Sequence, residues 1–297
     1  MKLNRITLKD KPLFLRYLNK GAHHLSVYAF QNIYIWNTLF EIRWALVRDS
    51  LCIFFRDRTG CFLYLPPLSR RLTQATLSDA FKVMDSYNPN RSISRVENVE
   101  EANLEQYQAW GFRITYKSSD YLCNRAEMVS LRGNRFKSKR WCTNYFSRHY
   151  EFEYLRFSRH YAKDCLKLYD LWARQRCGGH QDKVYRGMLS DSRKSLAVLL
   201  YNYHSLDIIG RIVKVSDAVK GFTFGFRLNP RVFCILYEVT GLSIKGLAQF
   251  IFRALSAEAA GYTYINIMDD SGLENLKTVK ASYHPERLIP AYIATQA

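Results

Sequence analysis

The same order of predicted helices and strands occurs twice along this chain, and that order limits the folds open to it. In the first half, two helical patterns precede three short β-branched and aromatic runs, WALVRD, LCIFFRD and CFLYLPP, which read as a meander of strands. A helix, a strand, a helix and a strand follow. The ranges expected for the first half are helices at 10–19, 26–36, 77–87 and 100–110 and strands at 44–49, 51–57, 61–67, 92–98 and 113–117.

The second half repeats this order with little residue identity, so the repeat is one of architecture. It begins with an extra strand, EFEYLRF, and again has two helical patterns before a three-stranded meander. Helix, strand, helix and strand then recur. The expected ranges are helices at 160–176, 190–204, 243–261 and 272–283 and strands at 151–157, 205–215, 221–229, 232–240, 262–268 and 286–294.

This element order resembles that of the GCN5-related N-acetyltransferase fold, here in tandem. We therefore predict an α/β (α+β) protein in which two acyl-CoA N-acyltransferase-like (GNAT-like) domains contain mixed, mostly antiparallel sheets flanked by helices. The length of 297 residues and a hydrophobic content of 48% suit two cores. The predicted domains are residues 1–125 and residues 126–297, and the second is expected to hold the active site.

Charge indicates the class of partner. Lysine and arginine number 44 against 26 aspartates and glutamates, a formal net charge of +18, which favours binding to nucleic acid or to anionic lipid headgroups. The sequence shows no transmembrane segment and no apolar leader, so we expect a soluble, cytoplasmic protein that touches an anionic membrane peripherally at most. The seven cysteines form no CxxC pair and no metal-ligand spacing, which is typical of reduced thiols and predicts no metal site.

The strongest local concentration of charge is LRGNRFKSKRWCTNYF, residues 131–146, which contains no carboxylate. Guanidinium and ammonium groups suit phosphates, and the interleaved aromatic rings suit bases. The alternative is a helix with a solvated basic face whose Phe136, Trp141 and Tyr145 pack inward. The predicted nucleic-acid-binding residues are Arg132, Arg135, Lys137, Lys139 and Arg140.

Polar residues at strand ends in the second half form the candidate active site. Groups just past the carboxyl ends of strands line the ligand crevice of an open α/β sheet, and a carboxylate beside lysines suits general base catalysis. The predicted catalytic residues are Glu238, Asp269, Asp270 and Lys280, and the predicted substrate-binding residues are Asn266, Lys277 and Tyr283. The alternatives are that the aspartates cap the following helix and that Glu238 pairs with Lys245 or Lys280.

Several reaction classes lack their motifs. There is no HExxH, no GxSxG, no Walker A sequence and no GxGxxG, which disfavours metal hydrolysis, serine triads, nucleotide hydrolysis and Rossmann cofactors. Acetyl-coenzyme A users of the fold usually carry Arg/Gln-x-x-Gly-x-Gly/Ala before a helix. The matching stretch, TGLSIKGLAQF, has Gly241 and Gly246 but lacks the leading residue and the glycine spacing. No cofactor is predicted, and acyl-CoA stays open as an alternative.

Three stretches resemble a bacterial family related to the C-terminal domain of phosphatidylglycerol lysyltransferase. DYLCNRAEMVSLRGNRFKSKRW is similar to one signature, NIMDDSGLENLKTVKASYHPERL to a second with an acidic pair, and LSVYAFQNIYIW to an N-terminal helix. The chain departs at Trp141-Cys142, where relatives often carry Asn-His, and at Val239-Thr240, where Lys-Ala is common. These departures bear on which acceptor is used and on activity.

The resemblance implies an aminoacyltransferase with aminoacyl-tRNA as donor and a lipid headgroup, peptide or small-molecule amine or hydroxyl as acceptor. In this hypothesis Glu238 or Asp270 orients or deprotonates the nucleophile, and Lys280 or a backbone N–H stabilises the oxyanion. The basic run would hold tRNA phosphates. The rival hypotheses are an acyl-CoA-dependent N-acyltransferase and a catalytically inactive polyanion-binding member of the fold.

Overall fold

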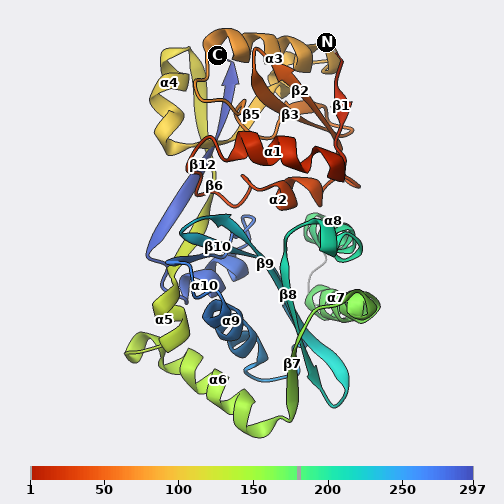
Figure 1. Ribbon diagram of the computed structural model, residues 1–297, viewed down its shortest axis with the longest axis vertical. Helices are drawn as coiled ribbons and strands as arrows, with labels where there is room; N and C mark the ends of the chain where they lie inside the picture. The colour runs from red at the N-terminus through yellow and green to blue at the C-terminus, as the bar shows by residue number, and fades with distance from the viewer. Residues whose placement is uncertain (1, 179–181, 297) are drawn as a thin grey trace. The chain divides into compact units, whose positions relative to one another are not determined.

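The computed structural model describes residues 2–178 and 182–296, which are grouped into two compact units (Figure 1). Unit 1 comprises Met1–Asp120, Asp269–Gly272 and Leu288–Ala297, and unit 2 comprises Tyr121–Met268 and Leu273–Arg287. Each unit contains a mixed, mostly antiparallel sheet with helices packed on it, as predicted from the element order.

Unit 1 is built on an antiparallel meander that continues into a parallel strand. Strands β2, β3 and β4 pair antiparallel in sequence, and β4 pairs parallel with β5 through Leu63 and Val96. The elements of this unit are β1 (Asn4–Arg5), α1 (Lys11–Leu18), α2 (Phe30–Tyr34), β2 (Glu41–Val47), β3 (Ser50–Arg56), β4 (Cys61–Leu63), α3 (Gln74–Tyr87), β5 (Arg95–Glu100) and α4 (Leu104–Ala109).

Unit 2 repeats this plan, and its first strand β7 pairs antiparallel with β8 as the short β1 does with β2 in unit 1. Strands β7 to β10 pair antiparallel in sequence, and β10 pairs parallel with β11. The elements are α5 (Arg125–Ser130), α6 (Lys137–His149), β7 (Phe152–Arg156), α7 (Ala162–Cys177), α8 (Lys183–Tyr201), β8 (Ile209–Val215), β9 (Ala218–Asn229), β10 (Val232–Thr240), α9 (Leu247–Glu258), β11 (Tyr264–Asn266) and α10 (Glu274–Ala281).

The last strand of each sequence half completes the sheet of the other half. Strand β6 (Phe112–Asn124) closes the first half of the sequence, yet its end pairs antiparallel with β11, with Cys123 opposite Ile265. Strand β12 (Arg287–Gln296) closes the second half, yet it pairs antiparallel with β5, with Ala291 opposite Glu100. In Figure 1 the blue β12 accordingly runs between β5 and the yellow β6. The two units are therefore interleaved in sequence.

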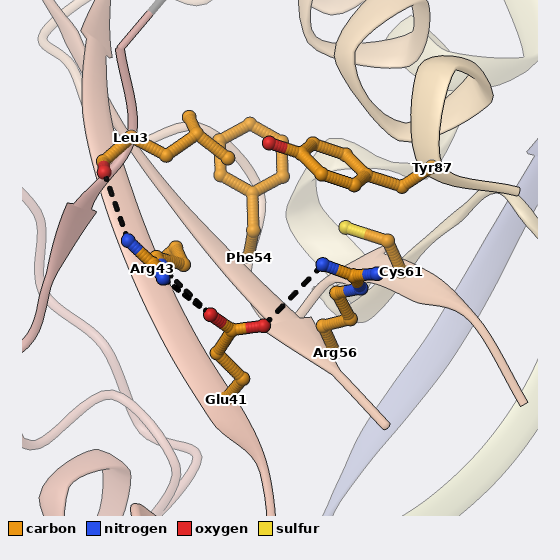
Figure 2. A pocket seen from close by; sticks show the side chains of 7 residues that line it. All are labelled: Leu3, Glu41, Arg43, Phe54, Arg56, Cys61 and Tyr87. Carbon is orange, nitrogen blue, oxygen red and sulfur yellow. Dashed lines mark hydrogen bonds and ion pairs between the residues drawn. The ribbon is translucent and has the colours of Figure 1, made fainter. Parts of the chain in front are cut away.

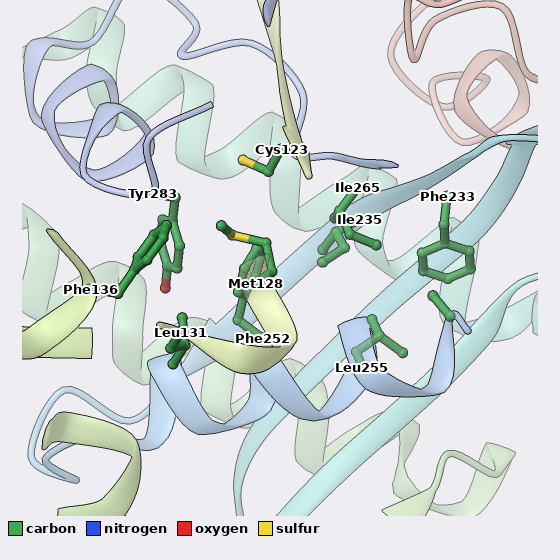
Figure 3. Packing of buried hydrophobic residues seen from close by; sticks show 11 residues of the cluster. Cys123, Met128, Leu131, Phe136, Phe233, Ile235, Phe252, Leu255, Ile265 and Tyr283 are labelled. Carbon is green, nitrogen blue, oxygen red and sulfur yellow. The ribbon is translucent and has the colours of Figure 1, made fainter. Parts of the chain in front are cut away.

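The sheet of unit 2 is covered by different helices on its two faces. Tyr237 of β10 bonds Ser195 and the Ser192 carbonyl of α8, whereas Arg211 of β8 pairs with Glu258 of α9. The α9 face carries a core of buried residues from five elements of unit 2 (Figure 3). Phe252 and Leu255 of α9 belong to this core, because the 3.6-residue period puts them on one side of the helix.

Several predicted helix starts differ from those in the structure, including those of α2 at Phe30 and α4 at Leu104, and the two largest differences in unit 2 concern α8 and α9. The helix expected from residue 190 begins at Lys183, where the Asp182 side chain accepts the N–H of Val184 as a cap. The helix expected from residue 243 begins at Leu247, because Gly246 takes a left-handed φ of 83° that interrupts the helical path. The second difference shapes the surroundings of the candidate functional site.

Candidate functional site

Strand β10 extends beyond its parallel neighbour β11, so the two strands are no longer paired at the carboxyl end of β10. The pairing with β11 covers only Val232 to Cys234, whereas β10 continues to Thr240 on the β9 side. A register shift between Ile235 and Tyr237 marks a bulge just before Glu238. Bulges re-aim the side chains that follow them, and the crevice beyond parallel strand ends is the usual ligand site of open sheets. Glu238 is the acidic residue at this position.

Glu238 is a half-buried residue whose carboxyl group lies in an apolar setting. Burial raises its pKa from an ordinary value near 4.5 to about 8, although the positive charge of Lys139 acts to lower it. Within the described residues, its buried Oε2 atom has no hydrogen-bond partner. Thr223, directly opposite on β9, likewise has a buried Oγ1 without one. Two such oxygens at facing positions favour a polar substrate group between them.

Lys139 is the cationic neighbour of this carboxyl group. It extends from α6, its Nζ donates to Ser282 Oγ at 2.7 Å, and it lies 4.0 Å from the centre of the Tyr283 ring. Burial lowers its pKa, and the charges of Cys142 and Glu238 oppose that shift. The ammonium is thus held by one hydroxyl and one aromatic face rather than by a direct carboxylate contact.

The Tyr283 ring forms an apolar wall of the site. It is 7% exposed and packs 4.5 Å from Phe252 of α9, centre to centre. Figure 3 shows it beside Phe136, in the same cluster as Met128 of α5. Such surroundings lower the local dielectric, which explains why burial dominates the pKa values of both Glu238 and Lys139.

Close packing of α6 on the start of α9 fixes Lys139 in place. A Cβ atom at Gly246 would lie 2.1 Å from the carbonyl oxygen of Cys142 and 3.1 Å from the Cβ of Phe146. Only glycine permits this approach together with a φ of 83°. This glycine therefore serves the packing of α6 on the start of α9.

Comparisons with known proteins agree with this fold. The family model "Phosphatidylglycerol lysyltransferase, C-terminal" matches residues 19–295. This chain belongs to that family. No curated protein matches the sequence.

Solved structures resemble the family member over its whole length. A conserved protein of Bacteroides thetaiotaomicron shares 24% identity at a TM-score of 0.89, with 100% of each chain covered. L-PGS of Bacillus licheniformis shares 16% identity at a TM-score of 0.66, covering 99% of this chain and 93% of that one. A tandem GNAT protein from clavulanic acid biosynthesis shares 8% identity at 0.52, covering 100% and 98%. The predicted tandem GNAT-like fold and the predicted family are both confirmed.

The other polar residues predicted in unit 2 of this lysyltransferase-family chain serve its own structure. Lys280 Nζ donates to the Ile267 carbonyl at 2.5 Å, and Lys277 pairs with Glu274 at the exposed surface. Asn266 is fully buried, and its Oδ1 accepts the N–H of Met268, which has a φ of 61°. Neither lysine is the neighbour that acts on the charge of Glu238, and Lys245 instead lies over two aromatic rings.

The two predicted catalytic aspartates belong to unit 1. Asp270 Oδ1 accepts the N–H of Gly272 at 2.9 Å, and Asp269 contributes to the raised pKa of the buried Tyr64, which burial dominates. Neither caps the next helix, because α10 begins at Glu274 after Leu273, which provides no side-chain cap. The structure thus groups Glu238 with Lys139 and Tyr283, and groups Asp269 and Asp270 with unit 1.

The basic run is divided between structural and exposed residues. Arg135 pairs with Glu127, so a nearby carboxylate does neutralise part of the run, and Arg140 bonds the carbonyl oxygens of Leu131 and Gly133. Arg132 and Lys137 are exposed. Of the three rings expected to pack inward, Phe136 does so, whereas Trp141 is 51% exposed and that part of the alternative is wrong.

Sequence reasoning missed Lys139 as the partner of Glu238. The available signal was helical spacing, since Lys139 shares a face with Thr143 and Phe146, the two buried residues of α6. A lysine on the inward face of a helix needs polar or aromatic contacts, which Ser282 and Tyr283 provide, and its charge acts on the carboxyl group at the end of an apolar strand.

A shallow polar pocket in unit 1 is a weaker candidate (Figure 2). Glu41 there lies between Arg43 and Arg56, with N–O distances of 2.8 Å from Arg43 Nε and 3.4 Å from Arg56 Nη1. The hydrogen bond from Arg43 lowers the pKa of Glu41, and burial raises the pKa of the nearby Cys61 thiol to about 12. The charges are mutually satisfied and the thiol is protonated, so the pocket offers neither a base nor a nucleophile.

Membrane spans and metal clusters are both absent from the part of the chain that the structure describes. None of its helices combines the length and apolarity that crossing a bilayer requires. No group of three or more His, Cys, Asp or Glu side chains among the described residues is arranged to hold a metal ion.

Substituting methionine for Lys139 is expected to move the pH dependence of any Glu238-dependent reaction to higher pH. The charge of Lys139 lowers the pKa of Glu238, so its removal leaves less carboxylate at neutral pH. We expect about tenfold slower turnover at pH 7 and partial recovery in alkaline buffer. A pH–rate profile measures this, with the exposed Lys163→Met on α7 as the charge-matched control. Identical profiles for both variants would argue against the coupling.

Proposed function

We propose that this chain is an aminoacyltransferase that uses aminoacyl-tRNA as donor and a lipid, peptide or small-molecule amine or hydroxyl as acceptor. The observation that carries the proposal is a buried carboxyl oxygen without a hydrogen-bond partner, on Glu238 at the end of β10, in a side chain whose pKa is raised by burial and lowered by the charge of the desolvated Lys139. A base whose pKa lies near the working pH is well suited to proton transfer. Membership of the phosphatidylglycerol lysyltransferase C-terminal family supports this reaction class.

The proposed step is attack of the acceptor on the ester carbonyl of the donor. Glu238 takes the proton of the attacking amine or hydroxyl while the new bond to the carbonyl carbon forms. The ammonium of Lys139 stabilises the negative charge that develops on the carbonyl oxygen. When the ester C–O bond breaks, the proton passes from Glu238 to the departing ribose oxygen, which restores the carboxylate. The cost of burying both charges is incurred during folding, so they need little rearrangement during reaction.

The test is a transfer assay with radiolabelled aminoacyl-tRNA. Because the family bears the name of phosphatidylglycerol lysyltransferase, lysyl-tRNA with phosphatidylglycerol vesicles is the first pair, followed by free amines and peptides. Label that moves into lipid or peptide supports the proposal. Label that stays on tRNA with every acceptor, while acetyl-coenzyme A acetylates an amine, would overturn it. Since aminoacyl-tRNA is made in the cytoplasm, the proposal also places the reaction there.

Reversing the exposed charges Arg132 and Lys137 to glutamate is expected to weaken tRNA binding and flatten its salt dependence. Removing one phosphate contact reduces the slope of log affinity against log salt by about one. Both side chains are exposed to solvent, so folding should be unaffected. Filter binding over a salt series measures the slope. The control is Lys277→Glu on α10, and an equal slope in all three proteins would remove these residues from the binding surface.

A further inference from the structure

The outward face of α6 carries a ladder of three aromatic rings, formed by Trp141, Tyr145 and His149 at helical spacings of four. The rings of Trp141 and Tyr145 are 5.2 Å apart at 31°, and those of Tyr145 and His149 are 4.0 Å apart at 11°, so the second pair is stacked. His149 Nδ1 also lies 2.9 Å from the Tyr145 carbonyl oxygen, which fixes its ring. Trp141 is 51% exposed. We call these three residues the α6 ladder.

The charge around the α6 ladder is uniformly positive on its helix. Residues 137–149 contain Lys137, Lys139, Arg140 and Arg148 and no carboxylate. Lys245, from the loop before α9, lies 4.5 Å from the centre of the Trp141 ring and 5.0 Å from that of Tyr145. A cation over an aromatic face is attracted by the ring, and here it places a positive charge where an anion beside the rings can bind.

Core packing does not explain the α6 ladder. The helix packs on α9 through Cys142 and Phe146, on the side that also presents Lys139 to Glu238. Trp141 and Tyr145 are about 200° and 240° around the axis from Lys139, since each residue advances about 100°. One helix therefore serves two surfaces, with the catalytic candidate on one side and exposed rings on the other.

We propose that the α6 ladder is a stacking platform for unpaired bases of single-stranded RNA. Aromatic rings beside cations are the usual means of binding single strands, because every base has a face to stack and every nucleotide carries a phosphate. Lys137, Arg148 and Lys245 are the phosphate contacts on this surface. Where the proposed function holds, the ligand is the unpaired aminoacylated end of the donor; this identification of the ligand, but not the platform itself, rests on that function.

Composition favours RNA over a membrane as the occupant. A helix that lies in a bilayer surface needs an exposed apolar face of leucine, phenylalanine or tryptophan side chains. Residues 137–149 contain no leucine, isoleucine, valine or methionine, and their one phenylalanine, Phe146, is buried. Between the rings the outward residues are polar, such as the exposed Asn144 and Arg148. On this surface, only the edge of the Trp141 ring is apolar enough to enter the acyl chains of a bilayer.

The test compares ring-removing variants on a short single-stranded RNA and on the same RNA annealed to its complement. We expect Trp141→Ala and Tyr145→Ala each to weaken single-strand binding about tenfold, the usual effect of removing one stacked base. The salt slope should be unchanged, because no charge is removed. Trp141→Phe, which keeps a ring, should recover most of the affinity. Tyr201→Ala on α8 removes an equally exposed ring, 52% exposed, and serves as the control.

Three outcomes would overturn the platform. They are an unchanged single-strand affinity in both ladder variants, an equal reduction for single strand and duplex, and a Trp141-dependent gain in binding to anionic vesicles without any effect on RNA. The RNA in this test carries no amino acid, and binding rather than transfer is measured. The two proposals can therefore fail separately. If no transfer occurs but Trp141→Ala weakens single-strand binding, the platform stands and the enzyme proposal falls. If transfer occurs and Trp141→Ala binds RNA normally, the reverse holds.

Discussion

Replacing Glu238 with glutamine is expected to lower the rate of aminoacyl transfer by a factor of about 10² to 10⁴, the usual contribution of a general base. The amide keeps the shape of the side chain and cannot accept the proton of the acceptor. In the unsubstituted protein, the rate should rise with pH and level off above about 8, where Glu238 is ionised. In the variant this rise should be absent. Single-turnover transfer over a pH series measures both effects.

The Glu238→Gln result has an internal check on folding. A carboxyl group whose pKa is raised by folding stabilises the protein fully below its unfolded pKa, near 4.5, and loses that contribution as pH rises through about 8. The variant, which does not titrate, should therefore be at least as stable as the parent at pH 9. Glu274→Gln on the exposed face of α10 is the matched control for activity. Full transfer by Glu238→Gln would falsify the assignment of the base.

Substituting alanine for Gly246 is expected to lower the free energy of unfolding by about 2–5 kcal/mol. A left-handed φ costs a non-glycine residue roughly 1–2 kcal/mol, and overpacking adds about 1–3 kcal/mol. Here the added Cβ would lie 2.1 Å from the Cys142 carbonyl oxygen. A backbone atom cannot rotate out of the way as a side-chain atom can. Either α6 or α9 must shift, and Lys139 shifts with α6. Urea unfolding gives the stability, and the transfer assay gives the functional cost.

Gly111→Ala is the control that isolates the steric part of this effect. Gly111 has a φ of 81°, almost that of Gly246 at 83°, but a Cβ atom there would meet nothing within 4 Å. Only the backbone cost, roughly 1–2 kcal/mol, should appear. An equal loss of unfolding free energy in the two variants would show that α6 and α9 can move apart at this contact without strain.

The element order is predictable because periodicity records which face of each segment is buried. Helix α9 carries that pattern clearly, whereas β9 and β10 are marked by continuous apolar runs because both of their faces are covered. The chemistry of Glu238 follows from a lone carboxylate in such an apolar strand. Periodicity does not record which helix covers that strand. The charge pattern therefore predicts Lys139 as a surface residue with its basic neighbours, although burial and Ser282 hold it beside the site. Its role as a phosphate contact stays a prediction.

Other parts of the site depend on pairings between distant segments. Asp269 and Asp270 come directly after β11, and strand order alone places them beside Glu238; the contacts of Asp269–Gly272 instead belong to unit 1. One of the two interpretations of the sequence also places the first two rings of the α6 ladder in the core, because aromatic residues on a helix are often buried. Their exposure follows from the tight fit of α6 on α9 through Gly246, which a sequence pattern cannot express.

The pairing of β12 with β5 has a consequence for how the chain is made. During synthesis, the meander β2–β3–β4 and β5 emerge early, but the neighbour of β5 arrives only after about another 190 residues have been joined, at Ala291. Until then one side of β5 exposes unpaired N–H and C=O groups, a surface open to mispairing and to chaperones. Loop closure over this span also slows folding. The N-terminal unit should therefore complete its fold last, although most of it is translated first.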